Sequence, residues 1–247
     1  MMSLSEMKLG EIVWKQYIYK LFSYSDALKS LIIIQLLGIG FSLLASGGGS
    51  SSDGYITVSV DTYSVDLVFI FTLIWIFVTS ILLTTKSYRF EDFTFVTSRL
   101  SSHLSNILYL ITVSAAAMIT LTLSSFLLYL LVRLFANTPL LYGGGSPGSP
   151  GALLLSAGAF LLYFILVSAL GYLAGGLAQI HKSLIAVLPV VLIVLPIYLS
   201  ISLGVYPLYS FYIAESSFWI LGIKIIFTAA ILFGGIILLF NNREVRA

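Results

Sequence analysis

The 247-residue chain has no cysteine, two histidines and few charged residues. Without cysteine, disulfide bonds, thiol catalysis and thiolate metal sites are excluded. The two histidines, His103 and His181, lie too far apart in the sequence to suggest a metal cluster. Charged residues make up 9% of the chain, against about 25% in a soluble domain. The net charge of +2 gives no reason to expect a nucleic-acid partner.

Apolar residues are abundant instead: they make up 59% of the chain, and the mean hydropathy is +1.07. A water-soluble fold of this length could not bury so much apolar surface. We therefore predict an all-α, polytopic membrane protein that forms a single transmembrane domain over 1–247. A spanning helix needs about 20 apolar residues. Six stretches qualify: 30–46, 64–85, 107–135, 152–179, 183–203 and 217–240.

The basic residues give the orientation, because cytoplasmic loops carry an excess of lysine and arginine. If the six spans alternate, most basic residues fall on one side: Lys8, Lys15, Lys20, Lys29, Lys86, Arg89, Arg99, Lys182, Arg243 and Arg246. We expect a protein of the cell membrane with both termini and the polar stretch 86–106 in the cytoplasm. A cleaved signal peptide ending after the first span is the less favoured alternative, since the lead of about 29 residues is long for one.

Residues 6–22 are expected to form an amphipathic helix in the inner membrane interface. Trp14 and Tyr17 lie on its apolar half and, with Lys15, are the predicted interfacial anchors. Gln16 falls on the polar half. Lys20 falls on the apolar half, where its long side chain can snorkel to water.

The polar stretch 86–106, called the island below, interrupts the apolar sequence between the second and third spans. Apolar residues at steps of three or four, beginning at Phe90 and Phe93, predict a helix with one apolar stripe. Such a helix suits docking of a soluble partner, because aromatic and arginine residues are the usual anchors of protein contacts. An interfacial helix lying on lipid is an equally good interpretation. The candidate docking residues are Arg89, Phe90, Glu91, Asp92, Phe93, Phe95 and Arg99.

Charged residues inside the predicted spans are rare and lie near the outer membrane face. Asp66, Arg133 and Lys224 have similar predicted depths. Intramembrane charges are often functional. We hypothesise that Asp66 pairs with Arg133 or Lys224 and holds the outer helix ends together.

Helix-breaking and small residues mark the second half of the chain. Pro189 and Pro196 predict kinks in the fifth span. Gly171 and Gly175 form a small-xxx-small pair in the fourth span, which predicts close helix packing. The aromatic stretch 204–216 resembles a short element dipping into the outer membrane face. Two Gly-rich stretches, 46–54 and 143–151, are expected to be solvated external connectors.

Sequence motifs for catalysis are missing. The chain contains no GxxxxGK[ST], no HExxH and no GxSxG. No membrane Ser/His or Asp/Asp pair stands out, and no deep row of acidic residues and histidines forms a proton relay. We expect neither an enzyme nor a proton-coupled carrier.

The order of these parts resembles the membrane subunit of ABC transporters of the ABC-2 class, over essentially the whole chain. The stretch FTFVTSRLSSHLSNILYL (93–110) is most similar to small Gram-positive permeases of this class, with Arg99 at the place of their basic residue before span three. The resemblance implies that 6–22 is the connecting helix, the island is the coupling helix, and 204–216 is the external re-entrant segment.

The resemblance also implies the partners. Two permease chains, identical or related, would form the pore, and two separate ATPase subunits would bind the islands from below. ATP and magnesium would be bound by the ATPase, and no cofactor by this chain. The expected function is export of an amphipathic peptide, lipid or drug. The alternatives are an ATPase-independent carrier or a peptide-immunity protein, and, less favoured, an intramembrane enzyme.

Overall fold

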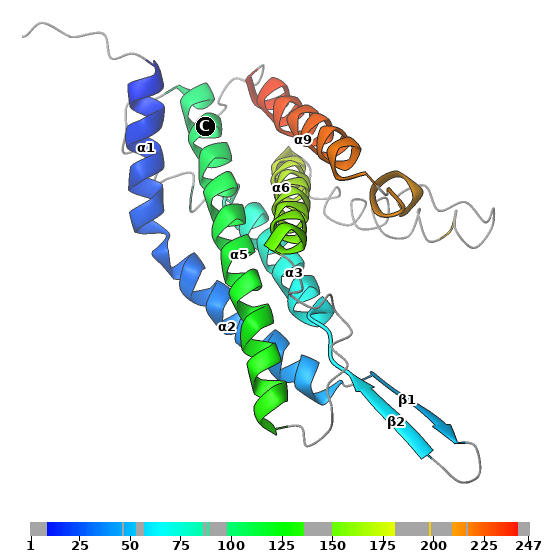
Figure 1. Ribbon diagram of the computed structural model, residues 1–247. Coiled ribbons are helices and arrows are strands. Elements are labelled where there is room, and N and C mark those ends of the chain that lie inside the picture. Colours follow the sequence, from blue (N-terminus) through cyan, green and yellow to red (C-terminus); the bar gives the residue numbers. More distant parts are fainter. Residues whose placement is uncertain are drawn as a thin grey trace, which may run out of the picture. The chain divides into compact units, whose positions relative to one another are not determined.

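The computed structural model describes residues 9–45, 47–52, 57–85, 88, 98–135, 150–180, 198, 209–215 and 217–241. Helices dominate this part of the chain, as the sequence predicts (Figure 1). They are α1 (Leu9–Ser23), α2 (Ser25–Leu44), α3 (Asp66–Leu82), α5 (Arg99–Phe135), α6 (Pro150–Ile180), the π-helical turn η2 (Tyr209–Ile213) and α9 (Phe218–Asn241).

Four of these helices are long and apolar enough to cross a membrane: Ser25–Leu44, Leu100–Leu134, Pro150–Gln179 and Phe218–Leu239. They correspond to the predicted spans one, three, four and six, so the membrane character of the chain is confirmed. The predicted second span forms α3, an apolar helix of 17 residues. The predicted fifth span, with Pro189 and Pro196, lies outside the described residues except for Tyr198. Six spans therefore remain a prediction.

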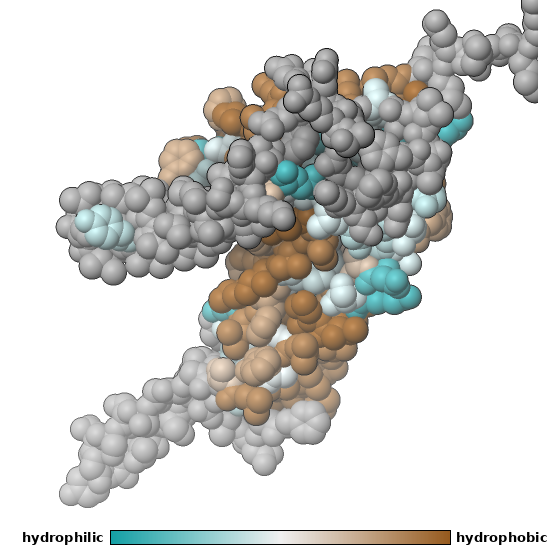
Figure 2. Space-filling view, turned by 180° about the vertical axis from the view of Figure 1, so that it is seen from behind, coloured by the Kyte–Doolittle hydropathy of each residue, from teal (hydrophilic) through white to brown (hydrophobic). Residues whose placement is uncertain are grey.

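Large apolar side chains cover much of the outer surface of these helices. Figure 2 shows brown, hydrophobic residues over much of the described part of one face. The exposed side chains include, on α2, Ile32, Ile33, Leu36, Leu37 and Phe41, and, on α9, Trp219, Ile223, Ile226 and Phe227. In water such surfaces would favour aggregation, whereas in a bilayer they contact lipid.

A hairpin departs from the all-α expectation. Strand β1 (Gly47–Ser52) pairs antiparallel with β2 (Thr57–Thr62), from Gly47 opposite Thr62 to Ser52 opposite Thr57. The stretch 46–54 was expected to be an irregular connector, because glycine and serine have low strand propensity. Its partner TVSVDT alternates β-branched residues, which favours a strand.

The chain divides into two compact units. The first comprises Met1–Ser25, Ile76–Ser114 and Leu162–Ala247, and the second comprises Asp26–Trp75 and Ala115–Leu161. In the second unit, Gln35 of α2 joins α3 and α5: its amide nitrogen donates to the Thr72 hydroxyl (3.4 Å), and its oxygen accepts from Ser124 (3.5 Å). The Trp75 indole donates to Ser30 at 2.9 Å.

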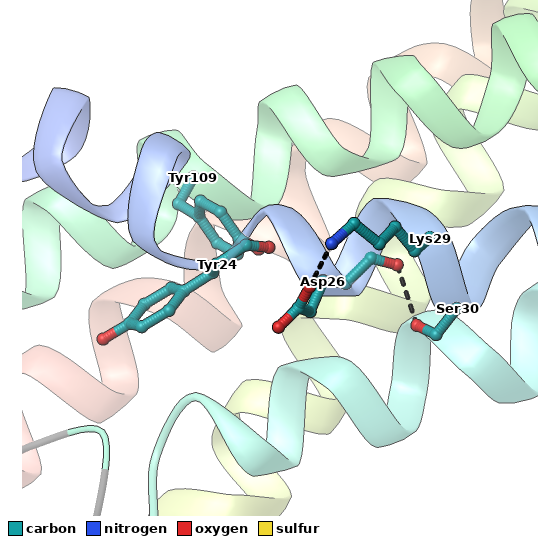
Figure 3. A network of polar contacts seen from close by, with 6 residues as sticks. Tyr24, Asp26, Lys29, Ser30 and Tyr109 are labelled. Atoms are coloured by element: carbon teal, nitrogen blue, oxygen red, sulfur yellow. Dashed lines mark hydrogen bonds and ion pairs between the residues drawn. The ribbon is translucent and has the colours of Figure 1, made fainter.

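An ion pair lies at the start of α2 (Figure 3). The Lys29 ammonium donates to the Asp26 carboxylate at 2.7 Å, one turn earlier in the helix. The Ser30 hydroxyl donates to the carbonyl of Ala27 at 2.8 Å. Both Asp26 and Lys29 are exposed, so this pair contributes little to stability.

In the first unit, α6 crosses α3 at very short distance. A Cβ atom added to Gly171 would lie 2.7 Å from the Phe77 carbonyl oxygen and 2.9 Å from the Ser80 Cβ. One added to Gly175 would lie 3.0 Å from the Ile81 Cα. The predicted close packing at these two glycines is confirmed. On its other side, α6 packs against α9 through Leu166, Leu221 and Ile225.

Candidate functional site

The buried side of α1 carries two polar residues beside the apolar Val13. Gln16 and Lys20, one turn apart, each expose only 1% of their surface, whereas Trp14 and Phe22 expose 59% and 76%. The helical wheel places Gln16 on the polar half and Lys20 on the apolar half, and the structure buries both side chains, so the expected snorkelling of Lys20 to water is not seen. A helical wheel shows only which residues of one helix share a face. It cannot show that a neighbouring helix offers hydrogen-bond partners.

Those partners come from the first turns of α5. The Lys20 ammonium donates to the Ser105 hydroxyl at 2.8 Å and to the Asn106 side-chain oxygen at 2.5 Å. The helix begins where it does because Ser98 caps it, accepting the Ser101 backbone N–H on its hydroxyl at 3.3 Å. The last part of the island, 99–106, is thus the start of α5. Lys20 is bonded directly to it.

From Asn106 the hydrogen bonds continue to α6. The Asn106 amide nitrogen donates to the Tyr172 hydroxyl at 3.1 Å, and the same hydroxyl lies 2.7 Å from His103 Nδ1. Which of the two groups, the Tyr172 hydroxyl or His103 Nδ1, donates in this contact depends on the histidine tautomer. The contacts thus link Lys20 through Asn106 and Tyr172 to His103, and we call these four residues the relay.

The relay is energetically important because it is buried. Hydrogen bonds to a charged group contribute about 1.5–3 kcal/mol, and each buried polar group left without a partner costs about 1–3 kcal/mol. Gln16 is such a group: within the described part of the chain, neither atom of its buried amide has a hydrogen-bond partner.

Aromatic rings extend the contact between the end of α1 and the island. The Tyr24 ring meets Tyr88, in the island, edge-on with centroids 4.7 Å apart. It meets Tyr109 of α5 in the same way at 5.7 Å, and the Tyr109 hydroxyl lies 3.5 Å from the Tyr24 carbonyl oxygen (Figure 3). Both described parts of the island, Tyr88 and 98–106, thus contact α1 or Tyr24, the residue that follows it.

Most of the predicted docking residues lie outside the described part of the chain. These are Arg89, Phe90, Glu91, Asp92, Phe93 and Phe95. Arg99 is the first residue of α5. The role of all seven in docking stays a prediction. So does the anchoring role of Trp14, Lys15 and Tyr17, although Trp14 and Tyr17 lie side by side with ring centroids 5.3 Å apart.

At the predicted outer side, Lys224 has a different partner from the one expected. It forms an ion pair with Glu215, donates to the Phe211 carbonyl at 3.3 Å, and lies 4.5 Å from the centroid of the Phe211 ring. Among the described residues Asp66 and Arg133 form no ion pair with each other, and an outer-end pair that involves Asp66 stays a hypothesis. Glu215 is available because the turn before α9 brings it back beside the helix.

These contacts hold the turn η2 in place. Besides the bonds of Lys224, the Tyr163 hydroxyl of α6 donates to the Tyr212 carbonyl at 2.8 Å. The turn lies within the segment 204–216 that was predicted to dip into the membrane. Residues 204–208 are outside the described part, so the depth of the segment stays a prediction.

No group of three or more histidine or acidic residues that could hold a metal occurs in the described part of the chain. The chain matches no known family, no curated protein and no solved structure. Its long apolar helices define it as a membrane protein.

Proposed function

We propose that this chain is the membrane-spanning subunit of an ATP-driven exporter of the ABC-2 type. The observation that supports it best is the bond from Lys20 to Ser105 and Asn106. These two residues lie at the end of the island, where an ATPase subunit would dock. A push on the island would reach α1 and α6 through short, buried hydrogen bonds.

The relay suits this task because its members are held from three helices at once. His103 and Asn106 lie on α5, Lys20 on α1, and Tyr172 on α6. Energetic coupling between distant sites is carried by such packed, hydrogen-bonded networks. A displacement of the first turn of α5 would move all three helices or break the bonds.

The rest of the proposal follows from the resemblance. Two such chains, identical or related, would form the pore in the cell membrane of a Gram-positive bacterium, with both termini in the cytoplasm. Two ATPase subunits would bind ATP and magnesium. The substrate would be amphipathic: a peptide, a lipid or a drug.

A second candidate function comes from the same contact. A serine hydroxyl 2.8 Å from a lysine ammonium has the composition of a Ser/Lys hydrolase dyad. Ser105 is fully buried, however, and its hydroxyl donates to the Ser102 carbonyl at 2.9 Å. A fluorophosphonate probe that labels the chain, and fails to label Ser105→Ala, would favour this enzyme.

The test of the main proposal is purification of the tagged chain from its native cells in mild detergent, followed by mass spectrometry. We expect a soluble ATPase in stoichiometric amount and ATP hydrolysis by the eluate. A chain that elutes without any ATPase after crosslinking in intact cells would overturn the proposal and favour a carrier or an immunity protein.

A further inference from the structure

The facing sides of α1 and α5 carry polar residues at one-turn intervals. On α1 these are Gln16 and Lys20, both buried. On α5 the buried Ser101 and half-buried Ser102 are followed one turn later by the buried Ser105 and Asn106, and the exposed cap residue Ser98 lies one turn before them, next to the helix start. Lys20 donates hydrogen bonds to Ser105 and Asn106, in the last of these turns. Each helix thus repeats polar residues with the spacing of one helical turn.

In Figure 1, α1 and α5 run in the same direction: the N-terminal ends of both helices lie at the top of the picture, and their colours follow the sequence downward. Gln16 precedes Lys20 by one turn, so it lies level with Ser101 and Ser102. Ser101 nevertheless donates to the Ser98 carbonyl of its own helix at 2.6 Å. The Gln16 amide is left without a partner among the described residues. In the present alignment of α1 with α5, the present register, Lys20 has hydrogen-bond partners and Gln16 has none among the described residues.

We propose that α1 and α5 have a second register, displaced by one helical turn, in which Gln16 gains a partner. In it Lys20 lies beside Ser101 and Ser102, and Gln16 lies beside Ser98. The displacement is about 5.4 Å, the pitch of an α-helix. One-turn shifts of packed elements are a known form of switching, because packed interfaces have discrete arrangements.

The direction of the shift follows from the residues of α5. Beyond Asn106, the next turn offers Tyr109 and Leu110, both buried in apolar surroundings. Moving Lys20 there would place its charge among rings and aliphatic groups. Moving it toward Ser101 keeps it among hydroxyls. The inference rests on the proposed function only for the source of the movement, which is the nucleotide-driven displacement of the island.

The first experiment asks whether Gln16 is unsatisfied in the resting protein, and it needs no functional assay. Gln16→Leu is compared with Gln35→Leu, an equally buried glutamine that does have partners on Thr72 and Ser124. We expect Gln16→Leu to raise the Tm of the purified protein by about 2–4 °C and Gln35→Leu to lower it. A fall in Tm for Gln16→Leu would overturn the inference, because the amide would then have a partner in this register.

The second experiment measures the register itself. The natural absence of cysteine allows engineered disulfides without background. Tyr17→Cys with Ser102→Cys has the same 85-residue separation as Lys20 and Ser105, and reports the present register. In the pair Leu21→Cys with Ser102→Cys, the position on α1 lies one helical turn further along, so a disulfide between these two cysteines reports the second register. All three positions are half-buried. A disulfide forms only when the two Cα atoms lie about 4.4–6.8 Å apart. A displacement of one helical turn therefore decides which of the two cysteine pairs can crosslink.

Oxidation is carried out in inside-out native membrane vesicles, with and without a non-hydrolysable ATP analogue. We expect the first pair to crosslink without nucleotide and the second pair to crosslink more strongly with it. Absence of the second crosslink under both conditions overturns the inference, as does absence of both crosslinks. Co-purification of an ATPase decides the proposed function separately. If no ATPase is present, the second crosslink in nucleotide-free vesicles still decides the register.

Discussion

Lys20 and Asn106 lie 86 residues apart in the chain, yet the ammonium of one donates to the side-chain oxygen of the other at 2.5 Å. Lys20 belongs to the amphipathic lead, and Asn106 ends the polar island. Their bond joins the two elements that the sequence sets apart from the membrane spans. It also makes both residues sensitive to each other's replacement.

Replacing Lys20 and Asn106 singly and together should measure the energy of the hydrogen bond between them. Lys20→Met leaves the Asn106 oxygen without its donor, and Asn106→Leu leaves the ammonium with one acceptor fewer. We expect a double-mutant cycle in thermal or denaturant unfolding to give a coupling energy of at least about 1 kcal/mol. Lys15→Met, on the exposed side of α1, is the matched control and should change stability by less than about 0.5 kcal/mol. Additive effects of Lys20→Met and Asn106→Leu would contradict a direct bond.

Tyr172→Phe removes one hydroxyl from the middle of the relay. Asn106 then loses an acceptor and His103 loses its contact with the hydroxyl, so we expect the free energy of unfolding to fall by about 1–3 kcal/mol. Nitrogen-15 NMR of labelled histidine should show a different His103 Nδ1 resonance in the variant than in the parent protein. Tyr209→Phe, an exposed tyrosine, is the control and should leave that resonance unchanged. An Nδ1 resonance that is the same in the parent protein and in Tyr172→Phe would contradict a hydrogen bond between Tyr172 and His103.

Gly171→Ala tests the crossing of α3 and α6. The new methyl group would lie 2.7 Å from the Phe77 carbonyl, which is backbone and cannot move aside, so we expect a loss of about 1–3 kcal/mol. Gly234→Ala is the control, because a Cβ there meets nothing within 4 Å and alanine favours a helix. It should be neutral or stabilising. Equal behaviour of the two variants in thermal unfolding would argue against the close crossing.

Charge reversal tests the ion pair beside η2. Lys224→Glu places two carboxylates together, and we expect it to lower the Tm, while adding Glu215→Lys should recover part of the loss. Asp66→Asn should have little effect, because Asp66 forms no ion pair within the described residues. If Asp66→Asn were as damaging as Lys224→Glu, the original hypothesis of an outer-end pair involving Asp66 would regain support.

The sequence predicted the helices better than it predicted their contacts. Apolar runs are long enough to identify α2, α5, α6 and α9, and the spacing of Gly171 and Gly175 identified a close crossing. The hairpin was missed because GGGSSS carries no strand signal of its own. It becomes a strand only by pairing with 57–62.

The relay was missed for a related reason. A helical wheel classifies Lys20 by its neighbours on the same helix, whereas its surroundings are set by Ser105 and Asn106 on another. One signal was present: the run SRLSSHLSN places polar residues on successive turns at the start of a membrane helix. Such a stripe needs polar partners, and Lys20 is one of them.

The most direct measurement concerns the island itself. The tagged chain, Phe90→Ala/Phe93→Ala and the control Phe22→Ala, an exposed aromatic residue of α1, are purified in parallel, and bound ATPase is quantified per chain. We predict a stoichiometric ATPase with the parent and with Phe22→Ala, and its loss from the double variant with elution volume and Tm unchanged. An ATPase retained in full by the double variant would contradict docking at the island.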